Sequence, residues 1–238
     1  MLADGSNFRP FGKIADGVLE EGHSRTAILD FVLGQLPMWR DRSDRPARTS
    51  ETTLTSQLCA HLNSAARKSS GLDCLQFRVE EADETESSRK IDLVAAPAGG
   101  SLIVEGRSYV DFDSILPIEC KRLPVPAGSG RDPREYVATS TGMSGGIQRY
   151  KAGKHGAAHG QAGLIAYVQA KNFDHWFSEI ETWIKDLHAA RSPGWSMADL
   201  LVKQALDAAA GMAVHNSVHS RIKLPAIHIR HMWIKMNS

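Results

Sequence analysis

The segment ILPIECKRL, residues 115–123, places two opposite charges inside a run that otherwise looks like a buried β-strand. Residues two apart in a strand point to the same face, so Glu119 and Lys121 share one face of this strand. Ile118 and Cys120 then share the opposite face. Charge pairs on strands are common, and one interpretation is therefore an ordinary structural ion pair.

A second acid in a similar setting favours a chemical role. The segment RKIDLVAAP places Asp92 inside another apolar strand. Buried carboxylates are costly unless a cation or good hydrogen bonds compensate them, so two at one end of a sheet indicate a hard divalent ion. Mg²⁺ prefers carboxylate oxygens and keeps several waters. A neighbouring lysine can orient or deprotonate a water, or stabilise charge on a phosphate. Asp92, Glu119 and Lys121 together predict a site for phosphodiester hydrolysis.

The elements that must position these residues alternate between helices and strands. Hydrophobic periodicity and capping residues predict helices over 23–39, 51–68, 173–191 and 196–210, and a shorter one around Gln148. Ser24 and Ser50 are expected N-caps, and Pro37 is expected to stop the first helix. Strands are expected over 74–82, 90–97, 115–123, 162–170 and 224–236, with strand-like sequence at 99–112.

Helices that flank a central group of strands predict an α/β or α+β layer architecture with a central mixed β-sheet. We expect residues 1–48 to form an N-terminal helical annex with an Arg-rich linker, and residues 49–238 to form the main domain. With 238 residues, 42% of them hydrophobic, the chain can bury one sizeable core.

Composition excludes several classes of protein. The net charge is only +1, so any nucleic-acid surface must be local. Three cysteines without close spacing argue against a disulfide framework and a zinc site. The N-terminal segment contains no apolar signal region, and no apolar run is long enough to span a membrane, so we expect a cytoplasmic protein. His155 and His159 are expected in a loop, and His215 and His219 have no third ligand nearby.

Asp92 followed by the IECK motif resembles the PD-(D/E)XK nuclease superfamily, which has the restriction-endonuclease-like fold. The order of elements is similar too, with a helix that carries Glu51 before the first strand and a GGIQRY helix after the motif. The resemblance spans roughly residues 50–180. Ile91 replaces the proline of the family motif, and the long interval before Glu119 makes Asp113 a competing metal ligand.

The resemblance implies a metal-dependent nuclease, with DNA as the favoured substrate and an association with restriction or phage defence. Asp92 and Glu119 would hold Mg²⁺, for which Mn²⁺ can substitute, and a main-chain carbonyl of residues 118–120 would add an oxygen. Lys121 would act on the attacking water. Glu51 and Gln148 would support catalysis, although an acid that suits the helix dipole and an exposed helical glutamine are the structural alternatives.

Local basic runs could line a phosphate track, with Arg122, Arg149, Lys151, Arg221 and Arg230 as candidates for binding nucleic acid. Further arginines, at positions 40, 42, 45 and 48, precede the helix of Glu51. Each run could equally be a solvated face without a ligand. The alternative function is a non-cleaving subunit of the same fold that binds nucleic acid or a partner protein. A homodimer or a partner subunit is compatible with either function.

Overall fold

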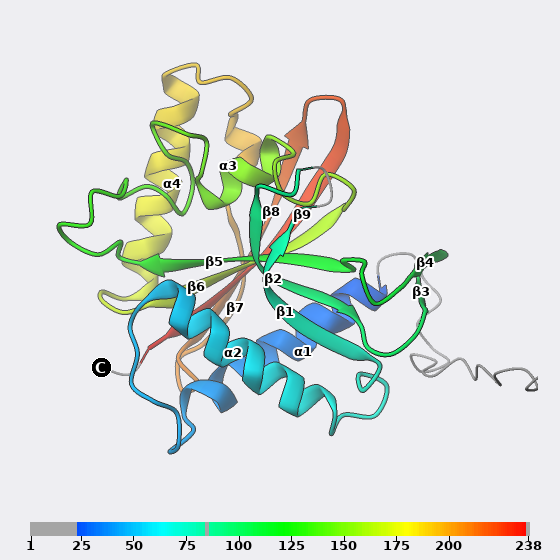
Figure 1. The fold of residues 1–238 in the computed structure, drawn as a ribbon. Coiled ribbons are helices and arrows are strands. Elements are labelled where there is room, and N and C mark those ends of the chain that lie inside the picture. Colours follow the sequence, from blue (N-terminus) through cyan, green and yellow to red (C-terminus); the bar gives the residue numbers. More distant parts are fainter. Residues whose placement is uncertain (1–22, 84–85, 237–238) are drawn as a thin grey trace, which may run out of the picture.

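The computed structural model describes residues 23–83 and 86–236, and its centre is a seven-stranded mixed β-sheet (Figure 1). The strand order is β1-β2-β5-β6-β9-β8-β7. The bounds of these strands are β1 Leu75–Ala82, β2 Lys90–Pro97, β5 Leu116–Leu123, β6 Gln161–Val168, β7 Val202–Asp207, β8 Met212–Arg221 and β9 Leu224–Lys235. This arrangement confirms the expected α/β class with a central mixed sheet.

The middle of the sheet is parallel and both flanks are antiparallel. β5, β6 and β9 run parallel, with Glu119 opposite Leu164 and Leu164 opposite His231. β1, β2 and β5 pair antiparallel on one side, and β7, β8 and β9 pair antiparallel on the other. The strand with the Glu-x-Lys pair therefore lies where the parallel block meets an antiparallel flank.

Helices cover both faces of the sheet and produce two hydrophobic cores (Figure 1). One core lies under α1 (His23–Arg40) and α2 (Glu51–Ala66) and includes Ile118 and Cys120 of β5. The other lies under α3 (Gly146–Lys151) and α4 (Phe173–Ala189). Because side chains alternate along β5, Glu119 and Lys121 point to the α3 side.

The first 22 residues of the expected annex lie outside the described residues. The described part of the annex packs on the sheet with the rest of the chain. Ile28, Val32, Leu36 and Trp39 of α1 are fully or almost fully buried, in the same core as α2. α1 therefore contributes directly to the core that supports β5.

Most predicted elements are confirmed, and α2 shows why. Ser50 is its N-cap and accepts a hydrogen bond from the Thr53 N–H at 3.3 Å. Leu54, Leu58 and Leu62 recur at helical spacing and are completely buried. The six-residue helix around Gln148 and the strands at residues 75–82, 90–97, 116–123, 161–168 and 224–235 also agree with the expectations.

The prediction that Pro37 ends the first helix is wrong, because α1 continues to Arg40. A proline removes only one N–H donor, and the last turn still closes through the Asp41 N–H, which donates to the Pro37 carbonyl at 3.0 Å. Buried Leu36 and Trp39 hold this turn on the sheet. Ser24 is not the N-cap either, since the helix already includes it.

The prediction of a helix over 196–210 is also wrong. This segment forms a short 3₁₀ turn, η1 (Met197–Asp199), followed by the edge strand β7. All six residues of β7 are exposed, and pairing with β8 satisfies one edge of its backbone. Tertiary strand pairing therefore overrides the local helical pattern. β8 was not predicted, although its buried residues alternate with a period of two.

The strand-like segment 99–112 forms a separate small hairpin, β3 (Leu102–Val104) with β4 (Arg107–Tyr109). It accommodates most of the long interval between Asp92 and Glu119 without adding a strand to the main sheet. Within the described ranges, no helix is both long and apolar enough to cross a membrane.

Candidate active site

The candidate site begins where β2 and β5 separate. The last residue pair of their ladder is Leu93 with Ile118, after which β2 no longer pairs with β5. The carboxylate of Asp92 replaces the missing strand partner and accepts a hydrogen bond from the Cys120 N–H at 2.8 Å. The next N–H on this edge of β5, that of Arg122, donates to the Glu51 carboxylate at 3.0 Å. The split between the strands thus fixes two carboxylates beside β5.

Lys121 lies at the centre of the acidic residues. Its Nζ is 3.3 Å from Asp92 Oδ2, 3.2 Å from Glu119 Oε2 and 3.6 Å from Glu51 Oε1. It also donates to the Cys120 carbonyl at 3.0 Å. The lysine side chain is 5% exposed, so this ammonium group is largely removed from water. Acids from three separate elements, α2, β2 and β5, therefore converge on one cation.

Glu119 is completely buried, and its carboxylate forms ion pairs with three basic groups of the described residues. Besides Lys121, Arg149 Nη1 donates to Oε2 at 3.1 Å, and His155 Nδ1 contacts Oε1. Burial alone would raise the pKa of Glu119, but the positive charges around it hold that pKa well below its usual range. Burial also opposes the charged form of Lys121, yet the surrounding carboxylates raise the pKa of the lysine. Both groups are therefore ionised at neutral pH.

Asp92 has a different environment. Its side chain is 26% exposed, and no described residue supplies a hydrogen bond to its Oδ1 atom. Burial, together with the negative charge of Glu119, raises the pKa of Asp92 to about 6. The site thus pairs a deeply buried, strongly acidic carboxylate with a partly exposed one that titrates close to neutrality.

Glu51 reaches the site from the first turn of α2, where an acid also suits the helix dipole. Both of its carboxylate oxygens accept from Arg131 Nη2, at 3.2 and 3.3 Å. Arg131 also bonds to Glu135 through its Nε, at 2.8 Å. The segment that follows β5 is therefore tied to the helix that precedes β1.

Two of the candidate residues are not brought to the carboxylates. Gln148 folds back on its own helix, where Oε1 accepts from the Gly145 N–H at 3.3 Å and the Thr139 N–H at 3.1 Å. Gln148 is thus neither beside the carboxylates nor the exposed helical glutamine of the structural alternative, because its side chain caps the start of α3. Asp113, the competing metal ligand, accepts from the Val110 N–H at 2.7 Å and closes a local turn away from Glu119.

Most of the candidate side chains for binding nucleic acid already form ion pairs or hydrogen bonds within the protein. Lys151 forms a buried ion pair with Asp199 at 2.5 Å, and Arg221 donates to three main-chain carbonyls, so neither side chain is free for phosphate. Arg230 pairs with Asp30, and Arg122 donates to Gln169 Oε1 at 2.6 Å. Among the five candidates, only Arg149 has a side chain that contacts the clustered carboxylates within the described residues, because Arg122 reaches Glu51 only through its backbone N–H.

A cleft of about 500 Å³ opens next to these carboxylates. Asp92, Arg149 and His155 form its wall toward the site. Arg89, Lys90 and Lys154 also line it, as does Glu80, and Arg89 is paired with Glu86 at 2.5 Å. Sequence reasoning missed His155, because a histidine in a glycine-rich loop carries no local signal of its contact with Glu119. It also missed Arg89 and Lys90, which come from the turn before β2 and from β2 itself, whereas Lys154 belongs to the basic run after Gln148 that the sequence indicates as a possible phosphate track.

The donor set fits a hard divalent cation by its chemistry. Mg²⁺ in proteins needs one or two carboxylates and keeps its waters, and Asp92 presents a free oxygen to the open cleft. Glu119 can become a second ligand only when it exchanges a contact with Lys121 or Arg149. In the described part of the chain, no group of three or more His, Cys, Asp and Glu side chains is arranged to hold a metal ion.

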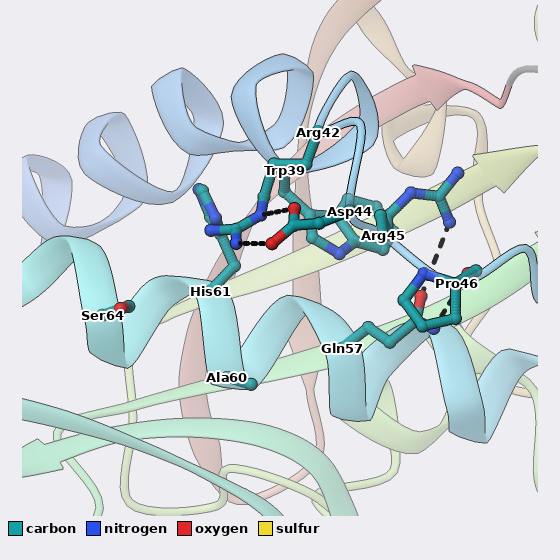
Figure 2. A pocket seen from close by; sticks show the side chains of 9 residues that line it. All are labelled: Trp39, Arg42, Asp44, Arg45, Pro46, Gln57, Ala60, His61 and Ser64. Carbon is teal, nitrogen blue, oxygen red and sulfur yellow. Dashed lines mark hydrogen bonds and ion pairs between the residues drawn. The ribbon is translucent and has the colours of Figure 1, made fainter.

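The Arg-rich linker forms a separate pocket of about 250 Å³ between the end of α1 and α2 (Figure 2). Arg42 pairs with Asp44, and the guanidinium of Arg45 lies 5.2 Å from the ring centre of Trp39. Arg40 is also engaged, with Asp41 and the Ala210 carbonyl. These arginines brace the linker, and their pocket contains none of the clustered acids.

The chain matches no family model, no curated protein and no solved structure in the three comparisons that we made.

Proposed function

We propose that this protein is a metal-dependent nuclease of the PD-(D/E)XK type, and that its seven-stranded sheet is a form of the restriction-endonuclease-like fold. One observation carries the proposal. Glu51, Asp92 and Glu119 come from three elements and converge on Lys121 beside a cleft with four basic side chains. Acids for a hard cation, a lysine for the water and cations for phosphate are the groups that phosphodiester hydrolysis requires.

Each residue has a distinct role in this proposal. Asp92 and Glu119 would hold Mg²⁺ or Mn²⁺, with the Cys120 carbonyl as a further oxygen. When bound, the metal would supply Lewis acidity and an activated water. Lys121, freed from one of its carboxylates, would orient that water and stabilise charge on the phosphate. Arg149 would hold a phosphate oxygen at the wall of the cleft.

His155 and Glu51 would act as positioning residues. The contact from His155 Nδ1 fixes the plane of the Glu119 carboxylate, which is completely buried. Glu51 holds the Arg122 N–H and keeps the end of β5 in place. Neither residue needs to touch the substrate to perform this role.

A second candidate function is nucleic-acid binding without cleavage. The observation that favours it is that Lys121, Arg149 and His155 already neutralise Glu119. Such a site is electrostatically satisfied without a metal, and a binding subunit of a larger assembly could retain it as a structural cluster.

Incubation of purified protein with supercoiled plasmid, linear duplex and single strands, with and without Mg²⁺ or Mn²⁺, tests the proposal. We expect cleavage only with metal, and a loss of at least about 10² in rate for Glu119→Gln and for Asp92→Asn. The matched control is Asp113→Asn, because this acid lies outside the cluster. Cleavage that survives Glu119→Gln would refute the proposed site, and metal-independent binding without cleavage would favour the second function.

A further inference from the structure

A second pocket, which the proposed chemistry does not use, lies beside the cleft. It has a volume of about 520 Å³ and lies between α4 and the segment that leads from β5 to α3. Met143 lines both the pocket and the cleft, and so separates them. On α3, Gln148 lines the pocket while the next residue, Arg149, lines the cleft. A ligand that enters the cleft therefore reaches the pocket across a single side chain.

The lining of this pocket is mainly aromatic and apolar. Trp183 and Leu187 come from α4, Trp195 from the turn after it, and both indole rings are half-buried. The ammonium of Lys151 lies over the Trp195 ring, 5.1 Å from its centre, and this cation–π contact helps to hold the ring in place. A pocket of this volume, lined by two indole rings, can admit a planar ring of the size of a nucleobase.

The rim of the pocket is polar. Arg134, Thr139 and Ser140 lie around it, and Gln148 contributes its amide. The Gln148 Oε1 atom is used by the backbone of residues 139 and 145, but no described residue accepts from its Nε2. The Thr139 hydroxyl is engaged with the Thr141 carbonyl and the Ser144 N–H, and Arg134 is paired with Asp132. The Gln148 Nε2 group is therefore the donor that the rim offers to the edge of a base.

We infer that the pocket binds an unstacked nucleobase of a single strand whose phosphates lie in the neighbouring basic cleft. The charged side chains of the cleft are the reason for preferring a nucleic acid as the ligand. The four cations that line the cleft, Arg89, Lys90, Arg149 and Lys154, outnumber its two acids, Glu80 and Asp92, and so favour a polyanion. An aromatic platform beside a cationic track is the arrangement that binds single-stranded nucleic acid. The inference deepens the proposed function and rests on it for the class of ligand.

The pocket also implies a preference between substrates. A base in a duplex is stacked and paired, and it must be extruded before it can enter such a pocket. A single strand offers its bases without that cost. We therefore expect single strands, or unpaired segments within a duplex, to bind more tightly than fully paired duplex.

Binding without metal tests this inference separately from cleavage. The probes are three labelled 12-mers in EDTA at low salt: a thymine single strand, a hairpin duplex and an abasic strand with the same backbone. The variants are Trp183→Ala in the pocket, Lys154→Ala in the cleft and Lys185→Ala as the control. Lys185 is exposed on the same helix, where it pairs with Glu181 away from the pocket.

Trp183→Ala should weaken binding of the thymine strand roughly 10- to 100-fold, because it removes a stacking partner. Its effect on the abasic strand should stay within about twofold, since that strand has no base to stack. Lys154→Ala should weaken both strands equally, and Lys185→Ala should change neither. Equal effects of Trp183→Ala on the two strands, or no effect on either, would overturn the inference.

Trp183 also packs against Trp176, with 6.4 Å between ring centres, so its truncation can destabilise α4. Trp183→Leu keeps the apolar volume without the ring and should show the same loss of affinity, whereas Trp183→Phe should largely restore binding. Size-exclusion chromatography of these variants tests whether a second copy of the chain occupies the pocket instead. A change from dimer to monomer in Trp183→Leu would make the pocket an interface between copies and would overturn the base pocket.

The outcomes are separable from those of the nuclease test. A protein that binds the thymine strand through Trp183 but never cuts fails the proposed chemistry and retains the pocket. A protein that cuts with metal but is indifferent to Trp183→Leu retains the chemistry and loses the pocket.

Discussion

Asp92 accepts a hydrogen bond from the backbone N–H of Cys120 at 2.8 Å, in the position that a neighbouring strand would otherwise occupy. β2 leaves β5 immediately after the Leu93–Ile118 pair, so the carboxylate satisfies a donor that the sheet no longer can. The same edge of β5 binds Glu51 through the Arg122 N–H. The acids of this site are therefore held by the architecture of the sheet as well as by their cationic partner.

Asp92→Asn should separate charge from hydrogen bonding. The folded-state pKa of Asp92, about 6, lies above the usual value of 3.8, so the folded state holds this proton more tightly than the unfolded state. The contribution of Asp92 to stability is fully present below pH 3.8 and is lost as the pH rises through 6. Asparagine carries no charge and can still accept from Cys120.

We therefore expect Asp92→Asn to be at least as stable as the wild type at pH 7.5, with a gain of at most about 3 kcal/mol. The gain should vanish at pH 4. Urea unfolding of the variant and the wild type at pH 7.5 and at pH 4 measures this gain in the free energy of unfolding. A variant that is several kcal/mol less stable at pH 7.5 would show that Asp92 serves mainly as a structural partner of Lys121.

Lys121→Met tests the centre of the cluster. The substitution keeps most of the stem and removes the charge that three carboxylates contact. Without divalent metal, the free energy of unfolding should fall by about 3–5 kcal/mol, because a buried carboxylate loses its partner. Millimolar Mg²⁺ should restore part of the loss and raise the melting temperature more than in the wild type. Cleavage should fall by at least about 10². Cleavage at the wild-type rate would show that Lys121 is not the catalytic lysine.

Salt dependence provides a test of the basic cleft. If Arg149 and Lys154 contact phosphates, affinity for nucleic acid should fall steeply as salt rises, through counterion release. Lys154→Ala should lower the slope of log K against log salt by about one, whereas Lys185→Ala should leave it unchanged. A titration of fluorescence anisotropy at several salt concentrations measures both slopes. An affinity that is flat with salt would point to a protein partner.

The environment of His215, in another part of the molecule, predicts that the stability of the fold decreases at acidic pH. It is buried between Phe177 and Trp233, and neither ring nitrogen has a hydrogen-bond partner within the described ranges. Burial, with the nearby charge of Lys203, lowers the pKa of His215 to about 4. The unfolded state, with a pKa near 6.5, then binds the proton more tightly, so stability falls as the pH drops from 6.5 toward 4.

His215→Leu removes this titration without breaking a hydrogen bond. At pH 5 the variant should lose about 2 kcal/mol less stability, relative to pH 7.5, than the wild type. Denaturant unfolding at pH 5, 6 and 7.5 tests the difference between the two proteins. Identical pH profiles would assign the acid sensitivity to other groups, such as His219 and His231 in the same core.

The sequence by itself determined the elements that carry the acids. Alternation within apolar runs placed Glu119 and Lys121 on one face of a strand, and Asp92 on another strand. The Ser50 cap and the leucines of α2 located the helix that delivers Glu51. These signals succeed because they are local, and both capping and periodicity act over a few residues.

Only the tertiary structure decided which groups meet. No local signal shows that β2 separates from β5 beyond Leu93, or that His155 folds onto Glu119. No local signal shows either that Gln148 caps its own helix, or that Lys151 forms an ion pair with Asp199. Strand pairing and buried ion pairs join residues that are far apart in sequence, and their partners are chosen by packing and desolvation across the whole fold. The residue types of the clustered acids and their lysine could thus be predicted from local pattern. Their contacts with one another depended on the order of the seven strands.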